Sequence, residues 1–341
     1  MNKKTYRRIK RIRRALLVPF EWLGIVFVLG LVQLLNRRGL FCFCDFLSAL
    51  MYFFDRRGKR RALQNLRIIR GSCSADEGSH LFDPDSASYA PTGAEVTVIR
   101  RSYRNMARTV GYAFWTCFRA RERTAAAGVM STECKRLLAE ERPVITVSGH
   151  IGCWEILSQL AFLEGHRMMS VAKDIGTRGM TRLLMRARTS IGREIVPAEG
   201  AFKPLLQGLR DGKSLGLLVD QKVSPKKGGV WIRFLGRPMP VSAAPAFFSA
   251  KARIPVFVAW SRPLADGRYR CELVARHSAD EARDIWALTQ AVAEDLSRVI
   301  RRHPSCWALN YNCFSTVPDE AALAALEKRE RRQDPPVAHS P

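Results

Sequence analysis

Residues 144–157 read VITVSGHIGCWEIL, which begins with the pattern of a buried strand and ends with the pattern of a helix. Val144 to Ser148 are β-branched or small residues without charge, and Gly149 then interrupts the strand pattern. Residues 152–164 follow with the apolar spacing of a helix. The stretch therefore predicts a strand, a short connection and a helix, which is the repeating unit of an α/β sheet.

Similar units follow along the chain. We expect further strands at 168–172, 194–198, 215–220, 255–260 and 269–275, and further helices at 178–189, 202–211, 242–252 and 284–302. This alternation predicts an α/β fold with a mixed, mostly parallel sheet and helices on both faces.

His150 and Glu155 stand at the junction between the first of these strands and its helix. Ligands bind at the carboxyl ends of strands in α/β folds, so the position of His150 indicates a catalytic or ligand-binding role. Glu155 lies in the first helical turn, where the helix dipole favours a carboxylate. We expect Glu155 to turn back and hold the imidazole, so that His150 removes a proton from a hydroxyl. The competing interpretation is a structural histidine, and a weaker one makes Cys153 a thiol nucleophile.

The N-terminal part of the chain has the pattern of a membrane anchor. Residues 1–14 carry eight basic side chains and no acid, and an apolar run of 21 residues follows at 15–35. A second apolar run covers 40–54, with basic clusters on both sides. Because clusters on both sides conflict with a single crossing, the segment is expected to lie in the membrane interface or to dip in and return. A buried core helix is the alternative.

These patterns divide the chain into a basic, helical membrane anchor, a catalytic domain and a tail. The anchor is expected at 1–62, the catalytic domain at 63–317 with a loop insertion at 71–93, and a flexible tail at 318–341.

The composition favours an anionic partner. The 341 residues carry 56 Lys and Arg against 31 Asp and Glu, a formal charge of +25. Nucleic acid, an anionic membrane and an acidic carrier protein all fit this charge. No helix-turn-helix or ribonucleoprotein motif is found, so nucleic acid is not expected as a partner. The nine cysteines form no CxxC pair, and the histidines lack zinc-ligand spacing, so no metal is expected.

The residues around His150 resemble the His-x4-Glu signature of the bacterial lipid A late acyltransferases, within the lysophospholipid and glycerolipid acyltransferase superfamily. Further segments resemble that family in the same order. They are RRALQNLRII (60–69), LLMRARTSIG (183–192), LRDGKSLGLLVDQ (209–221), VWIRFLGRPMPVSAAPAFFSAKARIPVFV (230–258) and HPSCWALNY (303–311).

This resemblance implies an O-acyltransferase that moves a fatty acyl group onto a hydroxyl of a glycolipid such as a lipid A precursor. The implied donor is an acyl thioester of acyl carrier protein or CoA, and no other cofactor is implied. His150 is implied as the base and Glu155 as its support. The residues implied in substrate binding are Arg188, Arg186, Asp220, Gln221, Gly149 and Gly152.

The family resemblance also implies a place at the inner, cytoplasmic membrane, with the catalytic domain facing the cytoplasm. One departure concerns the acceptor: the family has a basic His-Arg-Arg pattern after the Trp, whereas this chain has Asn310, Tyr311, Asn312 and Cys313. The identity of the acceptor therefore stays open. The alternative from another class is a catalytically silent, basic protein that binds lipid or nucleic acid.

Overall fold

The structure is a computed structural model that describes residues 24, 26–72, 91–172 and 178–333. Three sequence expectations fall wholly or mainly on other residues: the basic cluster at 1–14, the start of the apolar run at 15–35 and most of the loop at 71–93. They lie outside the described residues, as does the end of the tail from 334 onward.

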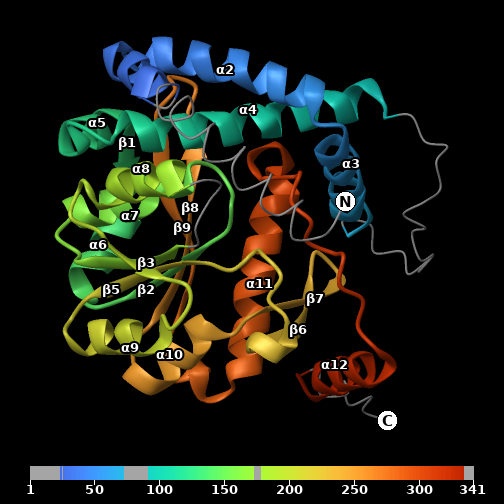
Figure 1. The fold of residues 1–341 in the computed structure, drawn as a ribbon. Coiled ribbons are helices and arrows are strands. Elements are labelled where there is room, and N and C mark those ends of the chain that lie inside the picture. The colour runs from blue at the N-terminus through green and yellow to red at the C-terminus, as the bar shows by residue number, and fades with distance from the viewer. Residues whose placement is uncertain (1–23, 25, 73–90, 173–177, 334–341) are drawn as a thin grey trace, which may run out of the picture.

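A seven-stranded sheet forms the centre of the molecule (Figure 1). Its strand order is β1-β9-β8-β2-β5-β3-β4, and every neighbouring pair is parallel except β8 with β9. The predicted mixed, mostly parallel sheet is confirmed. The strands are β1 (Gly128–Met130), β2 (Ile145–Ser148), β3 (Met168–Ala172), β4 (Glu194–Pro197), β5 (Ser214–Leu218), β8 (Val256–Pro263) and β9 (Tyr269–His277).

Helices cover both faces of this sheet, as the alternation of side chains along β8 shows. Val256, Val258 and Trp260 pack into one hydrophobic cluster, whereas Phe257 and Ala259 pack into another. The first face is covered by α9 (Phe202–Arg210), α10 (Ala244–Ala252) and α11 (Ile285–Arg302). The other face is covered by α5 (Ala120–Ala127), α6 (Thr132–Glu140), α7 (Trp154–Leu163) and α8 (Arg178–Thr189).

Two regions differ from the sequence expectations. A separate antiparallel hairpin, β6 (Gly229–Phe234) and β7 (Arg237–Ser242), was not expected, because Pro238 and Pro240 in β7 argue against a strand. The expected flexible tail contains the helix α12 (Glu320–Gln333). That expectation is wrong for these residues: Leu326 is buried against the core and Glu330 pairs with Arg233 on β6.

Short 3-10 turns are η1 (Pro225–Lys227), η2 (Glu281–Arg283) and η3 (Pro304–Cys306).

Three N-terminal helices lie against the edge of this body. They are α2 (Arg37–Phe54), α3 (Arg56–Gly71) and α4 (Gly93–Trp115), and α2 runs alongside α4 at the top of Figure 1. Arg108 on α4 ties the two helices together through Asp45, at 2.6 Å. In the part of the chain that the structure describes, no helix is both long enough and apolar enough to cross a bilayer.

Candidate active site

The connection between β2 and α7 brings His150 to the carboxyl edge of the sheet, as predicted. Gly152 has a φ of +60°, and a Cβ there would lie 1.8 Å from the carbonyl oxygen of Ser261. A Cβ on Gly149 would lie 3.0 Å from the Asp220 carboxyl. Neither glycine lines the cavity described below. Both therefore serve the site by permitting close approach of the backbone, not by contacting the cavity.

The carboxylate partner of His150 is Asp220. Nδ1 of His150 lies 2.7 Å from Oδ1 of Asp220, and the backbone N–H of His150 donates to Oδ2 at 2.7 Å. A carboxylate accepts hydrogen bonds, so the neutral imidazole carries its proton on Nδ1. The lone pair of Nε2 is then available, and Nε2 has no hydrogen-bond partner among the described residues. This is the arrangement that a general base requires.

Asp220 is fully buried and its charge is compensated from two sides. Nε1 of Trp307 donates to its Oδ2 at 2.8 Å, in addition to the two hydrogen bonds from His150. Burial alone would raise the pKa of the Asp220 carboxyl, but the interaction with His150 and the donated hydrogen bonds outweigh it. The pKa of Asp220 is therefore below its ordinary value, and the carboxylate is ionised at neutral pH.

Two aromatic rings fix the plane of the imidazole. The ring centroid of Trp154 lies 5.0 Å from that of His150, and the centroid of Tyr311 lies 4.8 Å from it on another side. Both rings meet the imidazole edge to face, which is a favourable geometry for aromatic pairs. The imidazole thus has little freedom to rotate away from Asp220.

Glu155 does not hold the imidazole, so this part of the sequence prediction is wrong. Its carboxylate is instead bound by Arg188, with Nη2 2.5 Å from Oε1, and by Arg193, with Nη2 3.2 Å from Oε2. Burial would raise the pKa of Glu155, but the charges and hydrogen bonds of the two arginines lower it. Two guanidinium groups within reach are stronger partners for this carboxylate than an imidazole that Asp220 already binds.

His150, Glu155 and Arg188 line one cavity of about 760 Å³ at the carboxyl edge of the sheet. This size is typical of a small-molecule site. Its lining falls into two groups, one for each face of the sheet. The apolar lobe comprises Val171, Ala201, Phe202, Leu205, Leu217, Val219, Ala244, Pro245 and Phe248. The polar lobe comprises Thr146, Ser148, Glu155, Ser158, Ser170, Arg188, Arg193 and Gly216, and the apolar side chains of Leu157, Ala161 and Met168 line the cavity on the same face.

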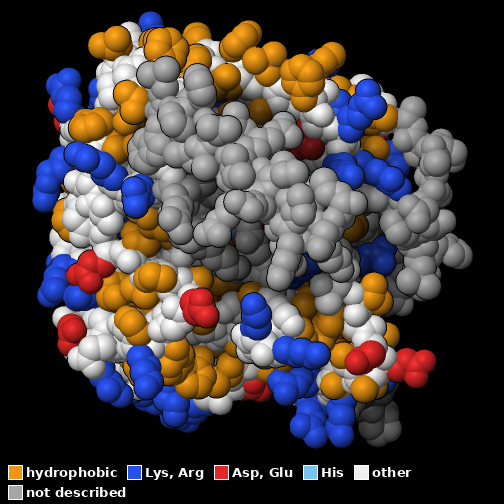
Figure 2. Space-filling view, in the orientation of Figure 1, with side chains coloured by type: hydrophobic (Ala, Val, Ile, Leu, Met, Phe, Trp, Pro, Cys, Tyr) orange, Lys and Arg blue, Asp and Glu red, His pale blue; other side chains and the backbone are white. Residues whose placement is uncertain are grey.

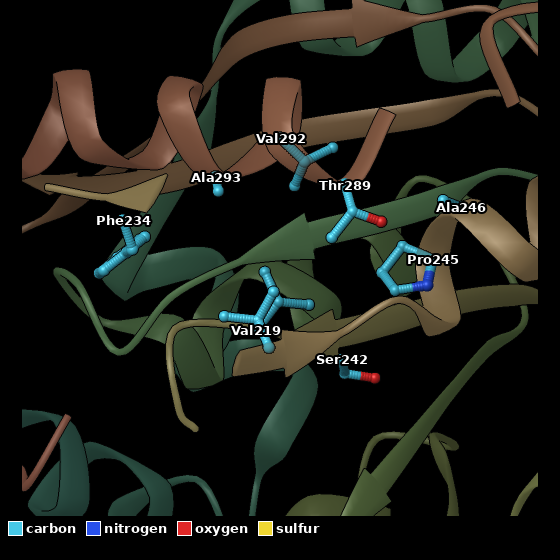
Figure 3. A pocket seen from close by; sticks show the side chains of 9 residues that line it. Val219, Phe234, Ser242, Pro245, Ala246, Thr289, Val292 and Ala293 are labelled. Atoms are coloured by element: carbon cyan, nitrogen blue, oxygen red, sulfur yellow. The ribbon is translucent and has the colours of Figure 1, made fainter. Parts of the chain in front are cut away.

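A second, much smaller cavity adjoins the apolar lobe (Figure 3). Its volume is about 10 Å³, and Figure 3 shows Thr289, Val292 and Ala293 on α11 facing Val219 and Pro245 across it. Val219 and Pro245 also line the large cavity. The small cavity is barely large enough for one water molecule, and it shares Val219, Ser242 and Pro245 with the large cavity.

The other predicted site residues lie at different places. Gln221 lines the cavity. Arg186 does not line it, and its guanidinium lies over the ring of Phe118, 5.5 Å from the centroid. Cys153 is fully buried, and burial raises the pKa of its thiol to about 12, which argues against a thiolate nucleophile.

Sequence reasoning gave no role to Trp307, Tyr311 and Arg193. Trp307 lies within the HPSCWALNY segment, so its position could have indicated a role. Nothing in the local pattern distinguishes Arg193 from its many basic neighbours. Within the described ranges, no group of three or more His, Cys, Asp or Glu side chains is arranged to hold a metal ion.

Comparison with known proteins shows the family of this chain. The chain is similar to two phosphatidylinositol mannoside acyltransferases of Mycobacterium tuberculosis, from strains CDC 1551 / Oshkosh and ATCC 25618 / H37Rv, with 24% identity over 186 residues. Each match covers 53% of this chain and 57% of the relative. The sequence profile described as bacterial lipid A biosynthesis acyltransferase matches residues 9–315, so the chain belongs to that family.

Proposed function

We propose that this protein is a membrane-associated O-acyltransferase that transfers a fatty acyl group from an acyl thioester to a hydroxyl of a glycolipid. The observation that carries the proposal is the His150–Asp220 pair, whose Nε2 is left without a described partner beside a cavity with one apolar and one polar lobe. The family and its relatives supply the class of reaction.

In the proposed reaction, Nε2 of His150 takes the proton of the acceptor hydroxyl as its oxygen attacks the thioester carbonyl carbon. A C–O bond forms, and the tetrahedral intermediate then expels the thiolate as the C–S bond breaks. The imidazolium returns its proton to the thiolate, which leaves as a thiol. Asp220 stabilises the imidazolium between these steps and keeps the proton on Nδ1.

The acyl chain is assigned to the apolar lobe. Val171, Leu217, Phe248 and their neighbours supply an uncharged surface between the sheet and α9 and α10. Burial of an alkyl chain there stabilises the complex by about 0.8 kcal/mol for each methylene group. The thioester carbonyl at the head of such a chain would then lie near the carboxyl edge, where His150 stands.

The polar lobe suits the acceptor. Its hydroxyl side chains and its Glu155–Arg188–Arg193 cluster offer hydrogen bonds to a headgroup. The cluster has two cations for one carboxylate and is therefore positive overall. We assign Glu155 as a positioning residue, because its carboxylate fixes Arg188 at the cavity wall.

The membrane attachment is assigned to the outward side of α2. Leu40 and Cys44 on this helix are buried, yet Phe46, Phe53 and Phe54 are exposed by 61%, 71% and 73%. Figure 2 shows apolar side chains gathered along this top edge of the molecule, with basic side chains nearby. An apolar face flanked by Arg and Lys is typical of a helix that lies in the interface of an anionic membrane.

The test is acyl transfer by the purified full chain in detergent or vesicles. Radiolabelled acyl-CoA and acyl carrier protein serve as donors, and extracted glycolipid serves as the acceptor. We expect a labelled lipid from the native protein and none from His150→Ala, with equal vesicle binding by both. If the native protein binds vesicles but labels nothing with either donor, the protein is a silent lipid-binding relative and the proposal is wrong.

A further inference from the structure

We propose that Lys222 and Lys227 form a phosphate site at the rim of the active-site cavity, which binds the phosphate on the pantetheine arm of the acyl donor. This inference rests on the proposed function, since it names the chemistry that recognises the donor. Both lysines line the cavity and both are exposed, so their ammonium groups stand where the cavity opens to solvent.

The charges around the cavity leave these two lysines uncompensated. Among the described residues that line it, Glu155 carries the only carboxylate, and that group is bound by Arg188 and Arg193. Lys222 donates a hydrogen bond to the hydroxyl of Ser315, which is neutral. Neither lysine has a carboxylate partner within the residues that the structure describes. The rim is therefore a positive region that attracts an anion.

The loop that carries the lysines is tightly folded. The N–H of Val223 donates to the carbonyl of Pro240 at 2.7 Å, and the N–H of Lys227 donates to the carbonyl of Ser224 at 2.8 Å. A Cβ on Gly229 would lie 2.0 Å from the carbonyl oxygen of Val223, so the two ends of the loop are in close contact. The backbone of both lysines is thus held in place before any ligand arrives, which lowers the entropy cost of binding.

The position of the loop favours the donor over the acceptor as the source of the phosphate. Lys222 comes two residues after Asp220, and η1 leads directly into β6. In Figure 1, β6 lies far from α2, the helix assigned to the membrane. A water-soluble donor can approach from that side, whereas a lipid acceptor enters from the membrane side.

The ligand chemistry is a phosphate ester on the arm that carries the thioester. CoA and the prosthetic group of acyl carrier protein share this phosphate. With the alkyl chain in the apolar lobe and the thioester beside His150, the arm must leave through the rim. Two ammonium groups at the rim can then bind the phosphate as point charges.

The test compares acyl-4′-phosphopantetheine with acyl-pantetheine, which lacks only the phosphate, in the full-length protein. The Lys222→Gln/Lys227→Gln variant should raise KM for the phosphorylated donor about tenfold or more, because charged hydrogen bonds are lost. Its kcat/KM for acyl-pantetheine should stay at the native value. Lys226→Gln is the matched control, because Lys226 is an exposed neighbour on η1 that does not line the cavity.

Three outcomes would overturn the inference: an unchanged KM for acyl-4′-phosphopantetheine, an equal loss with both donors, or a raised KM for a phosphorylated acceptor lipid alone. Lys222→Arg/Lys227→Arg should retain most of the affinity, which separates charge from local folding. The native protein transfers acyl groups in each of these outcomes. Failure of the proposed function is distinct, because then the native protein transfers from neither donor.

Discussion

His150 and Asp220 are 70 positions apart in the chain, yet the parallel register of two neighbouring strands places them side by side. Ser148 on β2 is paired with Leu218 on β5. His150 follows two positions after Ser148, and Asp220 follows two positions after Leu218. The two parallel strands end at the same edge of the sheet and point in the same direction. The pair is therefore a direct product of strand register.

The first prediction concerns this pair. Asp220→Asn should lower kcat about 10²- to 10⁴-fold, because an amide has one acceptor oxygen where the carboxylate accepts three hydrogen bonds, and it favours the wrong tautomer of His150. Steady-state kinetics with either donor measures this loss. Trp307→Phe removes one of the three donors and should have the smaller effect. A fully active Asp220→Asn variant would exclude His150 as an Asp-supported base.

The second prediction concerns the stability that the Glu155 cluster provides. Glu155→Gln leaves Arg193, whose side chain is 4% exposed, without its counter-charge, so the free energy of unfolding should fall by about 3–5 kcal/mol. Urea denaturation followed by circular dichroism measures the change. Glu140→Gln is the control, since its pair with Arg136 is exposed and should contribute less than about 1 kcal/mol. Equal stability losses in both variants would contradict the assignment.

The third prediction concerns the length of the acyl chain. Ala244→Phe should fill part of the apolar lobe and shift the preference to shorter chains. Loss of contact with two methylenes would lower kcat/KM for the preferred chain about 15-fold. Val219→Ala should open the lobe toward the small cavity and favour longer chains. Mass spectrometry of the products from a mixture of donors gives the chain-length preference of each variant. An unchanged preference in both variants would show that the acyl chain does not bind in this lobe.

The fourth prediction concerns membrane attachment. Phe53→Asp/Phe54→Asp should weaken binding to vesicles of anionic phospholipid about 10- to 100-fold, because two large apolar side chains would no longer insert. Vesicle flotation measures the bound fraction. Val317→Asp is the matched control, since Val317 is 82% exposed and lies outside α2. Should both variants bind vesicles like the native protein, α2 is not the membrane-facing element.

The fifth prediction is a pH dependence of stability that arises at His277, away from the active site. His277 bonds to Asp295 and to Glu281, both at 2.8 Å. The hydrogen bond with Asp295, followed by that with Glu281, raises the pKa of His277 above its ordinary value of 6.5, although burial opposes the shift. Its contribution to stability is thus complete below pH 6.5 and is lost as the pH rises through the folded-state pKa.

Thermal unfolding at a series of pH values measures this contribution. We expect His277→Gln to be less stable than the native protein at pH 6 and to differ less from it at higher pH. A constant difference between the two proteins across this range would show that titration of His277 does not contribute.

The sequence predicted the parts of this structure that depend on local pattern. The helix at 178–189 and the strand at 168–172 have the expected bounds, and His150 lies at the expected strand end. The partner of His150 could not be predicted, because the choice between Glu155 and Asp220 depends on strand register and on the position of Arg193. Both are tertiary features that no local periodicity reports.

The amide of Asn65 on α3 donates to the carbonyl oxygens of Leu309 and Tyr311, at 2.7 and 2.8 Å. From α4, Ser102 and Asn105 donate to the backbone of Trp307 and Ser305. The segment that shields the Asp220 carboxylate is therefore held in place by the same helices that precede the sheet. A gene fragment that encodes only the sheet and its covering helices would include the imidazole but lack these supports, so we expect the site to keep its geometry only when the N-terminal helices are present.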